Sequence, residues 1–570
     1  MIKIASPDAV RAIEVAANEA GFPFELMMEH AGTAVAKRAI ALINQLPQPD
    51  QARVTVLVGA TNNGADGLVA ARVIAQNSAA QVRIYLLKPR ADDDPHMAAV
   101  REIGLFIADA TADQRYRVLT NMIASAHIVI DAISGIGTLP PLREEAAKLL
   151  KAANAALGVG DETENIEGDI LIPSDPTSRV PDPPRPYILA VDCPSGLNCD
   201  TGEIDKHALT ADETVTFIAV KPGLLTFPGA AYVGSLTFAS IGIPENTPGF
   251  KEQKRFLVDS AYVREKLPAR NSNSHKGSYG KALVVGGSVN YTGAAGLAAT
   301  AAYRSGVGLV TVGAPAPVAA ALSGRVLEPT WLLLPHDMGV LAGDAAPILH
   351  KEANAYNAML IGCGINREKV TRDMLITLFK RDSKSAKRAI GFMSAKQTAQ
   401  SETETEYKLP PLVLDADALN LLSEIDSWWT LLPPNTVITP HAGEMGRLAK
   451  LEREVVEHNR WQIAAEKSAE WNCIVLLKGA HTLIAAPDGR VAVLPFKTSA
   501  LSTAGTGDIL AGLITGLIAQ GMPSFEATAC GAYIHGASGL AAAKTVGGER
   551  AVIAGDVLDH ISSTLRQIEG

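Results

Sequence analysis

The chain has 570 residues, of which 47% are hydrophobic and 19% are charged. This composition is sufficient for full cores and excludes a disordered chain, and the length accommodates two large α/β domains. The formal net charge is −9. A nucleic-acid-binding protein normally carries a basic stripe, so we expect no nucleic-acid partner.

The cysteines and the apolar runs bear on the compartment. There are five cysteines, an odd number, and no C-x-x-C pair. This pattern supports neither a disulfide framework nor a zinc ribbon. The first 20 residues contain no signal-peptide apolar region, and we find no uncharged apolar run long enough to span a bilayer. We therefore expect a cytoplasmic protein without a membrane partner.

The first half of the chain alternates short apolar strands with helices. The predicted strands are Val54–Gly59, Val82–Leu87, His127–Asp131, Tyr187–Asp192 and Val215–Val220, with helices at Gly67–Gln76 and Arg143–Ala156. Continuous apolar strands separated by helices are typical of a parallel sheet covered on both faces. The Pro-rich break at Pro244–Phe250 and the charged stretch Lys251–Arg255 predict a linker between domains at residues 1–245 and 255–570.

The second half repeats the same pattern. The predicted strands are Ala282–Gly287, Leu309–Gly313, Ala358–Gly362, Pro411–Asp415, Thr436–Thr439 and Cys473–Leu477. The stretch Val475–Leu494 predicts strands that turn at Asp488-Gly489, and Gly505–Ala519 predicts a Gly-rich loop that opens a long apolar helix. Two segments of low periodicity, Gly158–Pro186 and Lys380–Leu409, are interpreted as inserted surface loops.

Polar residues follow three strands of the first half. Asn62, Asn63 and Asp66 follow the first strand, Asp131 ends another, and Asp192 and Ser195 follow the next. Ligands of open parallel sheets bind beyond the carboxyl ends of the strands, and glycine amides at a helix N-terminus favour phosphate. The oxygen atoms of Asn63, Asp131 and Ser195 suit an alkali or alkaline-earth cation better than zinc. Each motif alone is also a common turn, but their occurrence after three strands favours a site.

The motifs Val58–Ala71, Asp131–Gly137, Val191–Leu197, Asp200-Thr201-Gly202 and Lys221-Pro222-Gly223 resemble those of NAD(P)H-hydrate epimerases, over nearly all of residues 1–245. The resemblance implies that Asn63, Asp131 and Ser195 hold potassium. It implies that Asp192 binds the hydrated nucleotide and acts at its reacting ring carbon. The other implied substrate residues are Asn62, Asn63, Gly64, Ala65, Asp66, Gly135, Ile136, Gly137, Thr138, Leu139, Pro140 and Pro141. Ala65 stands where the family has a second glycine.

A second Gly-rich loop, Ser502–Asp508, precedes the apolar helix near the C-terminus. It is not a Walker motif. Gly505 and Gly507 would let backbone N–H groups approach a phosphoryl oxygen, and Asp508 is placed to take a proton from an attacking hydroxyl. The motif by itself fits a simple turn with a helix cap equally well.

A catalytic role is favoured by further motifs, at His275–Gly287, Tyr291–Gly313, Leu412–Leu422, Thr439–Leu448, Val475–Gly489 and Leu501–Gly521. Through these stretches, residues about 255–570 resemble the ribokinase-like ADP-dependent NAD(P)H-hydrate dehydratases. The resemblance implies that Asp508 is the catalytic base and contacts the hydrate together with Ala294, Gly364 and His441. The implied nucleotide-binding residues are Lys478, Gly479, Ala480, His481, Thr482 and Gly507. One departure is Gly362-Cys363-Gly364-Ile365-Asn366, where the family has Gly-Pro-Gly-Leu-Gly.

Together the resemblances imply an α/β protein with an N-terminal Rossmann-like three-layer sandwich and a C-terminal ribokinase-like three-layer α/β/α domain. They imply an enzyme that interconverts the R and S forms of hydrated NADH and NADPH (NADHX and NADPHX). It would also dehydrate the S form with ADP, giving AMP and phosphate, in the presence of Mg²⁺ and K⁺. We also expect a homo-oligomer. Two alternatives stay open: a kinase of a small alcohol in the second half, and a non-catalytic nucleotide-binding module in the first.

Overall fold

The computed structural model describes residues 1–91, 93–158, 185–380 and 409–570. The chain divides into two compact units, which we call the first unit (residues 2–253) and the second unit (residues 254–570). The division falls inside the stretch Lys251–Arg255, where the sequence predicts the linker. Most of each predicted insertion lies outside the described residues.

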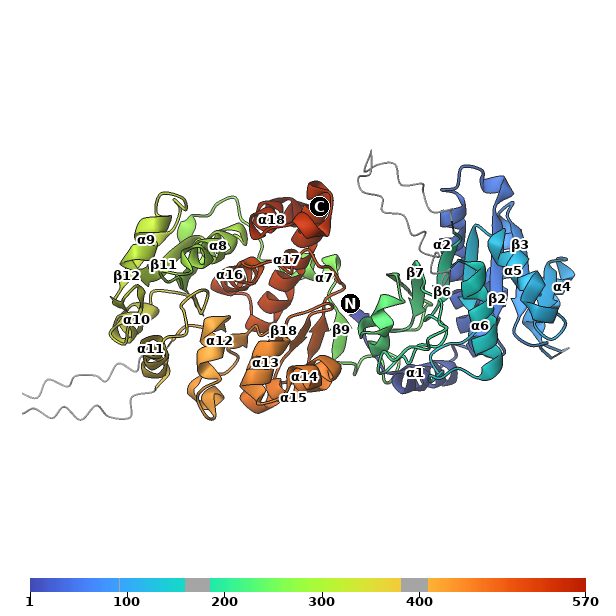
Figure 1. Cartoon of the computed structure of the whole chain (residues 1–570), viewed down its shortest axis with the longest axis horizontal. Helices are drawn as coiled ribbons and strands as arrows, with labels where there is room; N and C mark the ends of the chain where they lie inside the picture. The colour runs from blue at the N-terminus through green and yellow to red at the C-terminus, as the bar shows by residue number, and fades with distance from the viewer. Residues whose placement is uncertain (92, 159–184, 381–408) are drawn as a thin grey trace, which may run out of the picture. The chain divides into compact units, whose positions relative to one another are not determined.

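The first unit is built on one parallel sheet (Figure 1). In spatial order its strands are β4 (Phe106–Asp109), β3 (Gln81–Leu86), β2 (Arg53–Val58), β5 (Ile128–Ala132), β6 (Tyr187–Val191), β7 (Glu213–Phe217) and β8 (Ser235–Ala239). Its helices are α1 (Pro7–Glu19), α2 (Phe24–Ile43), α3 (Asn62–Asn77), α4 (Pro95–Glu102), α5 (Arg117–Ala124) and α6 (Glu144–Ala156).

Two hydrophobic cores explain why the strands are apolar throughout. Val56 and Val58 of β2 pack into a core with residues of α1 to α4, whereas Leu57 packs with α5 and α6 on the other face. Successive side chains of a strand point to opposite faces, so a strand covered on both sides needs apolar residues at every position. The predicted three-layer arrangement is therefore confirmed for this unit.

Two predicted elements of the first unit have other bounds. The helix expected at Gly67–Gln76 is α3, which begins at Asn62, so the glycine-containing motif is its first turn. Ala65 is therefore helical and buried, which an alanine accommodates without strain. The strand expected at Val215–Val220 is β7, which ends at Phe217 because Ile218 turns the chain with a φ of 65°.

The second unit is built on a mixed sheet. In spatial order its strands are β9 (Arg255–Leu257), β20 (Val491–Val493), β19 (Leu483–Ala485), β18 (Ile474–Leu477), β17 (Val437–Ile438), β16 (Leu412–Leu414), β15 (Ala358–Ile361), β10 (Lys281–Val285), β11 (Leu309–Pro315) and β12 (Thr330–Leu334). β18, β19 and β20 pair antiparallel, with the predicted Asp488-Gly489 turn between β19 and β20, and the other pairs are parallel. β13 (His336–Asp337) and β14 (Val340–Leu341) form a separate hairpin.

Helices cover both faces of this sheet (Figure 1). α8 (Thr292–Arg304), α16 (Thr506–Ala519), α17 (Ser524–Val546) and α18 (Ala554–Glu569) lie on one side. On the other side lie α11 (Lys369–Phe379), α12 (Asp417–Leu422), α13 (Ala442–Ala449), α14 (Arg453–His458) and α15 (Arg460–Trp471). The remaining helices are α7 (Ser260–Lys266), α9 (Ala316–Leu322) and α10 (Ala345–Ala353). Among the helices that the structure describes, none is both long and apolar enough to cross a membrane.

The apolar helix predicted at Gly505–Ala519 is α16, and nearly all of its residues are buried. A helix that is apolar all round is buried on all sides. Its approach to α8 is close: a Cβ on Gly512 would lie 2.2 Å from the carbonyl oxygen of Ala298, and one on Gly516 would lie 2.1 Å from Ser305 Oγ. Glycine at these positions therefore lets the two helix backbones approach each other.

We predict that Gly512→Ala destabilises the second unit by about 1–3 kcal/mol, because the added methyl group overlaps the backbone of α8. Gly555→Ala is the matched control, since Gly555 lies in α18 with open space around its Cβ position. Calorimetric unfolding of the full chain measures both variants. An equal loss of stability in the two variants would contradict the packing argument.

Candidate active sites

The carboxyl ends of β2, β5 and β6, neighbours in the first sheet, bring together the residues predicted to hold a cation. Ser195 donates hydrogen bonds to Asp131 from its Oγ (2.6 Å to Oδ1) and from its backbone N (2.9 Å to Oδ2). Ser134 connects the third residue, because its backbone N donates to Ser195 Oγ at 2.9 Å and its carbonyl accepts from Asn63 Nδ2 at 3.0 Å. Asn63, Asp131 and Ser195 therefore belong to one network.

The donor set of this network fits a hard monovalent cation. Asp131 is fully buried, and burial raises the pKa of its carboxyl group, although the hydrogen bonds from Ser195 counteract the shift. Within the described parts of the chain, no lysine or arginine contributes to this shift. A buried carboxylate without a positive partner is costly. The carboxylate, amide and hydroxyl oxygens here are the ligands that such a cation prefers.

Asp192 lies beside this network with a buried lysine as its partner. It directly follows β6 with a φ of 64°, and its Oδ1 accepts hydrogen bonds from Lys221 Nζ, Thr216 Oγ1 (2.9 Å) and the backbone N of Phe217 (3.2 Å). Lys221 is fully buried. The sequence analysis assigned it no role, although it belongs to one of the motifs that carried the resemblance.

Two more carboxyl groups share this lysine. Burial raises the pKa of Asp66 well above its ordinary value, and the charges of Asp192 and Glu14 raise it further, while Lys221 lowers it. Asp66 Oδ1 is buried without a hydrogen-bond partner. Burial likewise raises the pKa of Glu14. Asp66 therefore keeps its proton at pH values at which an ordinary aspartate is ionised. The sequence analysis missed Glu14, because it gave no signal beyond the spacing of an amphipathic helix.

The other predicted substrate residues of the first unit form two segments. Asn62, Gly64 and Ala65 lie in the first turn of α3. Gly135 approaches Asn63, since a Cβ at this position would lie 3.1 Å from Asn63 Cβ. The loop then continues through Ile136, Gly137, Thr138, Leu139, Pro140 and Pro141. Leu139, at the outer end of this loop, is 68% exposed. The two segments therefore meet at Asn63.

In the second unit, the N-terminus of α16 presents Asp508. Gly505 takes a φ of 92° before the helix begins, and Asp508 lies in its first turn. Burial raises the pKa of Asp508 to about 7, and the charge of Asp415 contributes in the same direction. Cys363 hydrogen-bonds with Asp508 and acts in the opposite direction. The residue predicted as a base is thus a buried carboxyl group that titrates near neutral pH.

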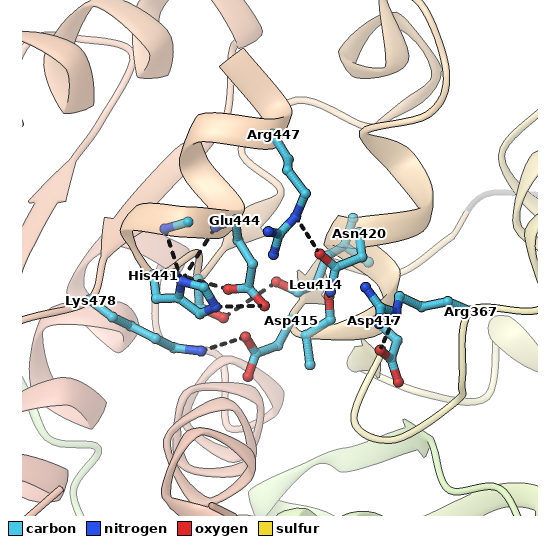
Figure 2. A network of polar contacts seen from close by, with 12 residues as sticks. Arg367, Leu414, Asp415, Asp417, Asn420, His441, Glu444, Arg447 and Lys478 are labelled. Atoms are coloured by element: carbon cyan, nitrogen blue, oxygen red, sulfur yellow. Dashed lines mark hydrogen bonds and ion pairs between the residues drawn. The ribbon is translucent and has the colours of Figure 1, made fainter. Parts of the chain in front are cut away.

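An ion pair stands beside this helix terminus. Lys478 Nζ lies 2.5 Å from Asp415 Oδ1, and Asp415 is buried (Figure 2). A Cβ on Gly507 would lie 3.3 Å from Lys478 Nζ and 3.6 Å from Asp415 Oδ2. The Gly-rich loop, the lysine and the aspartate therefore meet at one point. Asp415 was interpreted only as the end of a predicted strand, so its role was missed.

His441, which the sequence predicts to contact the hydrate, caps the N-terminus of α13. Its Nδ1 accepts hydrogen bonds from the backbone N of Gly443 (3.0 Å) and of Glu444 (3.3 Å), and Glu444 Oε2 accepts one from the His441 backbone N (2.9 Å; Figure 2). Burial and the charge of Lys478 lower the pKa of His441. Because Nδ1 accepts, the neutral ring carries its proton on Nε2 and can donate there.

Gly364 and Ala294, both predicted to contact the hydrate, are neighbours. Gly364 has a φ of 67°, and a Cβ at this position would lie only 2.9 Å from that of Ala294, too close for a side chain. The departures from the family motif are accommodated nearby. Asn366, at the position of the last glycine, takes a φ of 69°, which asparagine tolerates better than most residues. Cys363, at the proline position, is buried against Asp508.

A cavity of about 170 Å³ opens beside the Lys478–Asp415 pair. It is lined by all the predicted nucleotide-binding residues except His481, that is by Lys478, Gly479, Ala480, Thr482 and Gly507. The imidazole of His481 is buried and its Nδ1 lies 3.1 Å from the carbonyl oxygen of Leu494. The structure therefore does not bring the His481 side chain into this cavity.

We predict that Asp508→Asn stabilises the second unit above pH 7. The pKa of Asp508 is about 7 in the folded state and 3.8 for the unperturbed group, so ionisation costs stability progressively as pH rises from about 4 to 7. Each pKa unit corresponds to about 1.4 kcal/mol, and we expect a gain of about 2–4 kcal/mol at pH 8. Thermal unfolding of the unmodified protein and of Asp508→Asn between pH 4 and 8 measures this gain in stability. A difference in stability that does not grow with pH would contradict the buried charge.

Two family models match the chain. A model described as NAD(P)H-hydrate dehydratase matches residues 282–563, and a model described as YjeF-related protein N-terminus matches residues 25–223. Among solved structures, an ADP/ATP-dependent NAD(P)H-hydrate dehydratase from Bacillus subtilis, co-crystallised with ATP and Mg²⁺, is 27% identical with a TM-score of 0.42. The match covers 55% of this chain and 98% of that one.

Curated relatives match over almost the whole length. The bifunctional NAD(P)H-hydrate repair enzyme Nnr of Moorella thermoacetica is 34% identical over 562 residues, which cover 97% of this chain and 95% of the relative. The enzyme of the same name from Coxiella burnetii is 31% identical over 555 residues, covering 97% of each chain. The chain therefore belongs to the family of bifunctional NAD(P)H-hydrate repair enzymes, which join an epimerase to a dehydratase.

Proposed function

We propose that the first unit epimerises NADHX and NADPHX and that the second unit dehydrates the S epimer with ADP as phosphate donor. The observation that carries the assignment of the second unit is Asp508, a buried carboxyl group at a helix N-terminus, beside Lys478 and a cavity lined by the Gly479–Ala480 backbone. A buried acid that titrates near neutral pH next to an anion-binding helix end suits proton abstraction coupled to phosphoryl transfer.

In the dehydratase reaction, Asp508 takes the proton from the C6 hydroxyl of the hydrate as its oxygen attacks the β-phosphorus of ADP. The new O–P bond replaces the bond to the α-phosphate oxygen, and AMP leaves. Backbone N–H groups at Gly505–Gly507 and the charge of Lys478 stabilise the negative charge on the transferred group. Asp415 positions Lys478 through the 2.5 Å ion pair.

Phosphate then leaves from C6, because it is a far better leaving group than hydroxide. The ring nitrogen supplies the electron pair, the departing phosphate takes the C5 proton, and the C5–C6 double bond restores the dihydropyridine. His441 Nε2 and the close pair Ala294–Gly364 would hold the hydrate during these steps. Mg²⁺ would neutralise the phosphate charge, and Asp415, the carboxylate beside Lys478 and Gly507, would hold it.

For the epimerase we propose that Asp66 and Asp192 act as the acid and the base. Asp66 keeps its proton because of burial and its acidic neighbours, so it can protonate the C6 hydroxyl as water leaves and the ring nitrogen forms an iminium ion. Water adds to the opposite face of C6 and gives its proton to Asp192. Lys221 and Thr216 hold the Asp192 carboxylate in place for this step. Solvent then restores both protonation states.

We propose that K⁺ is held by Asn63, Asp131 and Ser195 and supplies a positive charge near the nucleotide. A cytoplasmic location is supported by the five cysteines, all of which are buried free thiols. The expected homo-oligomer stays a prediction.

We predict that substitutions at the two sites separate the two activities. With mixed R and S NADHX, ADP and Mg²⁺, Asp508→Asn should lower recovery of 340 nm absorbance at least 100-fold while chromatography still detects interconversion of the epimers. Asp192→Asn should recover the S fraction at the normal rate and then slow to the spontaneous rate. The same assay with ATP identifies the donor. Loss of both activities in either variant, or of neither, would refute the assigned roles.

We predict that K⁺ stabilises the first unit through Asp131. Thermal unfolding in KCl should occur at a higher temperature than in tetramethylammonium chloride of equal ionic strength, because the cation compensates a buried carboxylate. Asp131→Asn should abolish this difference. As a matched control, Asp109→Asn removes a half-buried carboxylate of the same unit that lies outside the Asn63–Asp131–Ser195 network, and should keep the difference. A K⁺ effect that survives Asp131→Asn would place the ion elsewhere.

A further inference from the structure

A buried histidine without a role in the steps above lines the nucleotide cavity. His535 lies in the middle of α17, is 6% exposed, and belongs to the cavity wall together with Gly507 and Thr506. Its Nε2 atom is buried and has no hydrogen-bond partner. Buried polar atoms are nearly always hydrogen-bonded, so an unpartnered one in a cavity wall indicates that a ligand supplies the partner.

The protonation state of this ring follows from its other contact. The backbone of Thr506, the first residue of α16, forms a hydrogen bond with the His535 ring. Since Nε2 has no partner, the bonded atom is Nδ1, and it must donate because the backbone carbonyl can only accept. Burial lowers the pKa of His535 to about 4, so the ring is neutral at physiological pH. Nε2 is therefore a bare acceptor that needs an N–H or O–H donor.

The surroundings favour a flat apolar group over a sugar or a phosphate. The ring of Phe496 lies so close to Gly536, the neighbour of His535, that a Cβ there would be 2.2 Å from the Phe496 ring. The wall includes Leu494, Leu510 and Ala532 besides Phe496. An aromatic side chain fixed against a helix backbone with aliphatic neighbours suits the face of a nucleobase. Phosphate would instead lie toward Lys478 and Gly507.

We propose that His535 is the residue that selects the adenine base of the phosphate donor, by accepting at Nε2 a hydrogen bond from the 6-amino group. This inference rests on the proposed function, in which the cavity binds ADP. The 6-amino group is the one N–H donor on the ring system of neutral adenine. A 6-oxo purine places an acceptor oxygen against the Nε2 lone pair, so the same histidine rejects hypoxanthine and guanine nucleotides.

The test compares phosphate donors with the full-length enzyme, in the 340 nm recovery assay with S-NADHX and Mg²⁺. We expect kcat/KM for ADP to exceed that for inosine diphosphate by about 100-fold, and purine riboside diphosphate, which has no 6-substituent, to fall between them. Equal use of ADP and inosine diphosphate would overturn the proposal without any variant. No recovery with either ADP or ATP would instead refute the proposed function.

Variants then test whether His535 is the residue that discriminates between these phosphate donors. His535→Phe keeps a flat ring but removes the acceptor, and we expect it to raise KM for ADP about tenfold, with little change in kcat, and to erase the preference for ADP over purine riboside diphosphate. His535→Gln offers an amide oxygen and should restore part of that preference. His458→Phe is the matched control. His458 is exposed on α14, and the hydrogen bond assigned to its ring joins it to the carbonyl of Glu454.

Epimerase activity of the same preparations reports whether each variant is folded in its first unit, and a circular dichroism melt reports the second. Retention of the full donor preference in a folded His535→Phe enzyme would overturn the proposal. If that variant unfolds, the ranking of the three donors with the unmodified enzyme and with His535→Gln still decides the question.

Discussion

Buried carboxyl groups are the constraint on which both sites depend. Asp131, near the carboxyl end of β5, and Asp508, in the first turn of α16, are both buried, so burial disfavours their charged forms. The two groups are stabilised differently. Asp131 is held by Ser195 in a network of neutral donors that suits a cation, whereas Asp508 is balanced between Asp415 and Lys478. The surroundings of Asp131 therefore suit the binding of a cation, and those of Asp508 suit the transfer of a proton.

The helices packed against α16 fix the position of the Gly-rich loop and of Asp508. Glycines at its contact with α8 bring the two backbones together, and α17 packs on the opposite side with His535 bonded to the first residue of α16. The start of α16, where the Gly-rich loop and Asp508 lie, is therefore tied to its neighbours on two sides. A loop positioned in this way can present its N–H groups without reorganisation during the reaction.

The departures from the family motifs show which positions need glycine and which do not. Ala65 lies inside a helix, so the missing glycine costs nothing there. Asn366 adopts the left-handed conformation that a glycine would take and donates its backbone N to Asp417 at 3.0 Å. Gly364 also has a positive φ, and in addition it faces Ala294 so closely that a Cβ would overlap it. Gly364 therefore needs glycine for two reasons, the position of Asn366 for one that asparagine also meets, and the position of Ala65 for none.

Local sequence determined the two α/β halves, the linker, most strands to within a residue or two, and the candidate residues carried by continuous motifs, such as Asn63, Asp131 and Asp508. Hydrophobic periodicity and glycine spacing are properties of neighbouring residues, so they can be recognised in the sequence alone. Only the tertiary structure brought Glu14 and Lys221 close to Asp192, paired Asp415 with Lys478, and placed His535 in the wall of the cavity. Their contacts join elements far apart in the chain, and the burial that shifts their proton affinities or leaves an atom unpartnered exists only once the sheets and helices have packed.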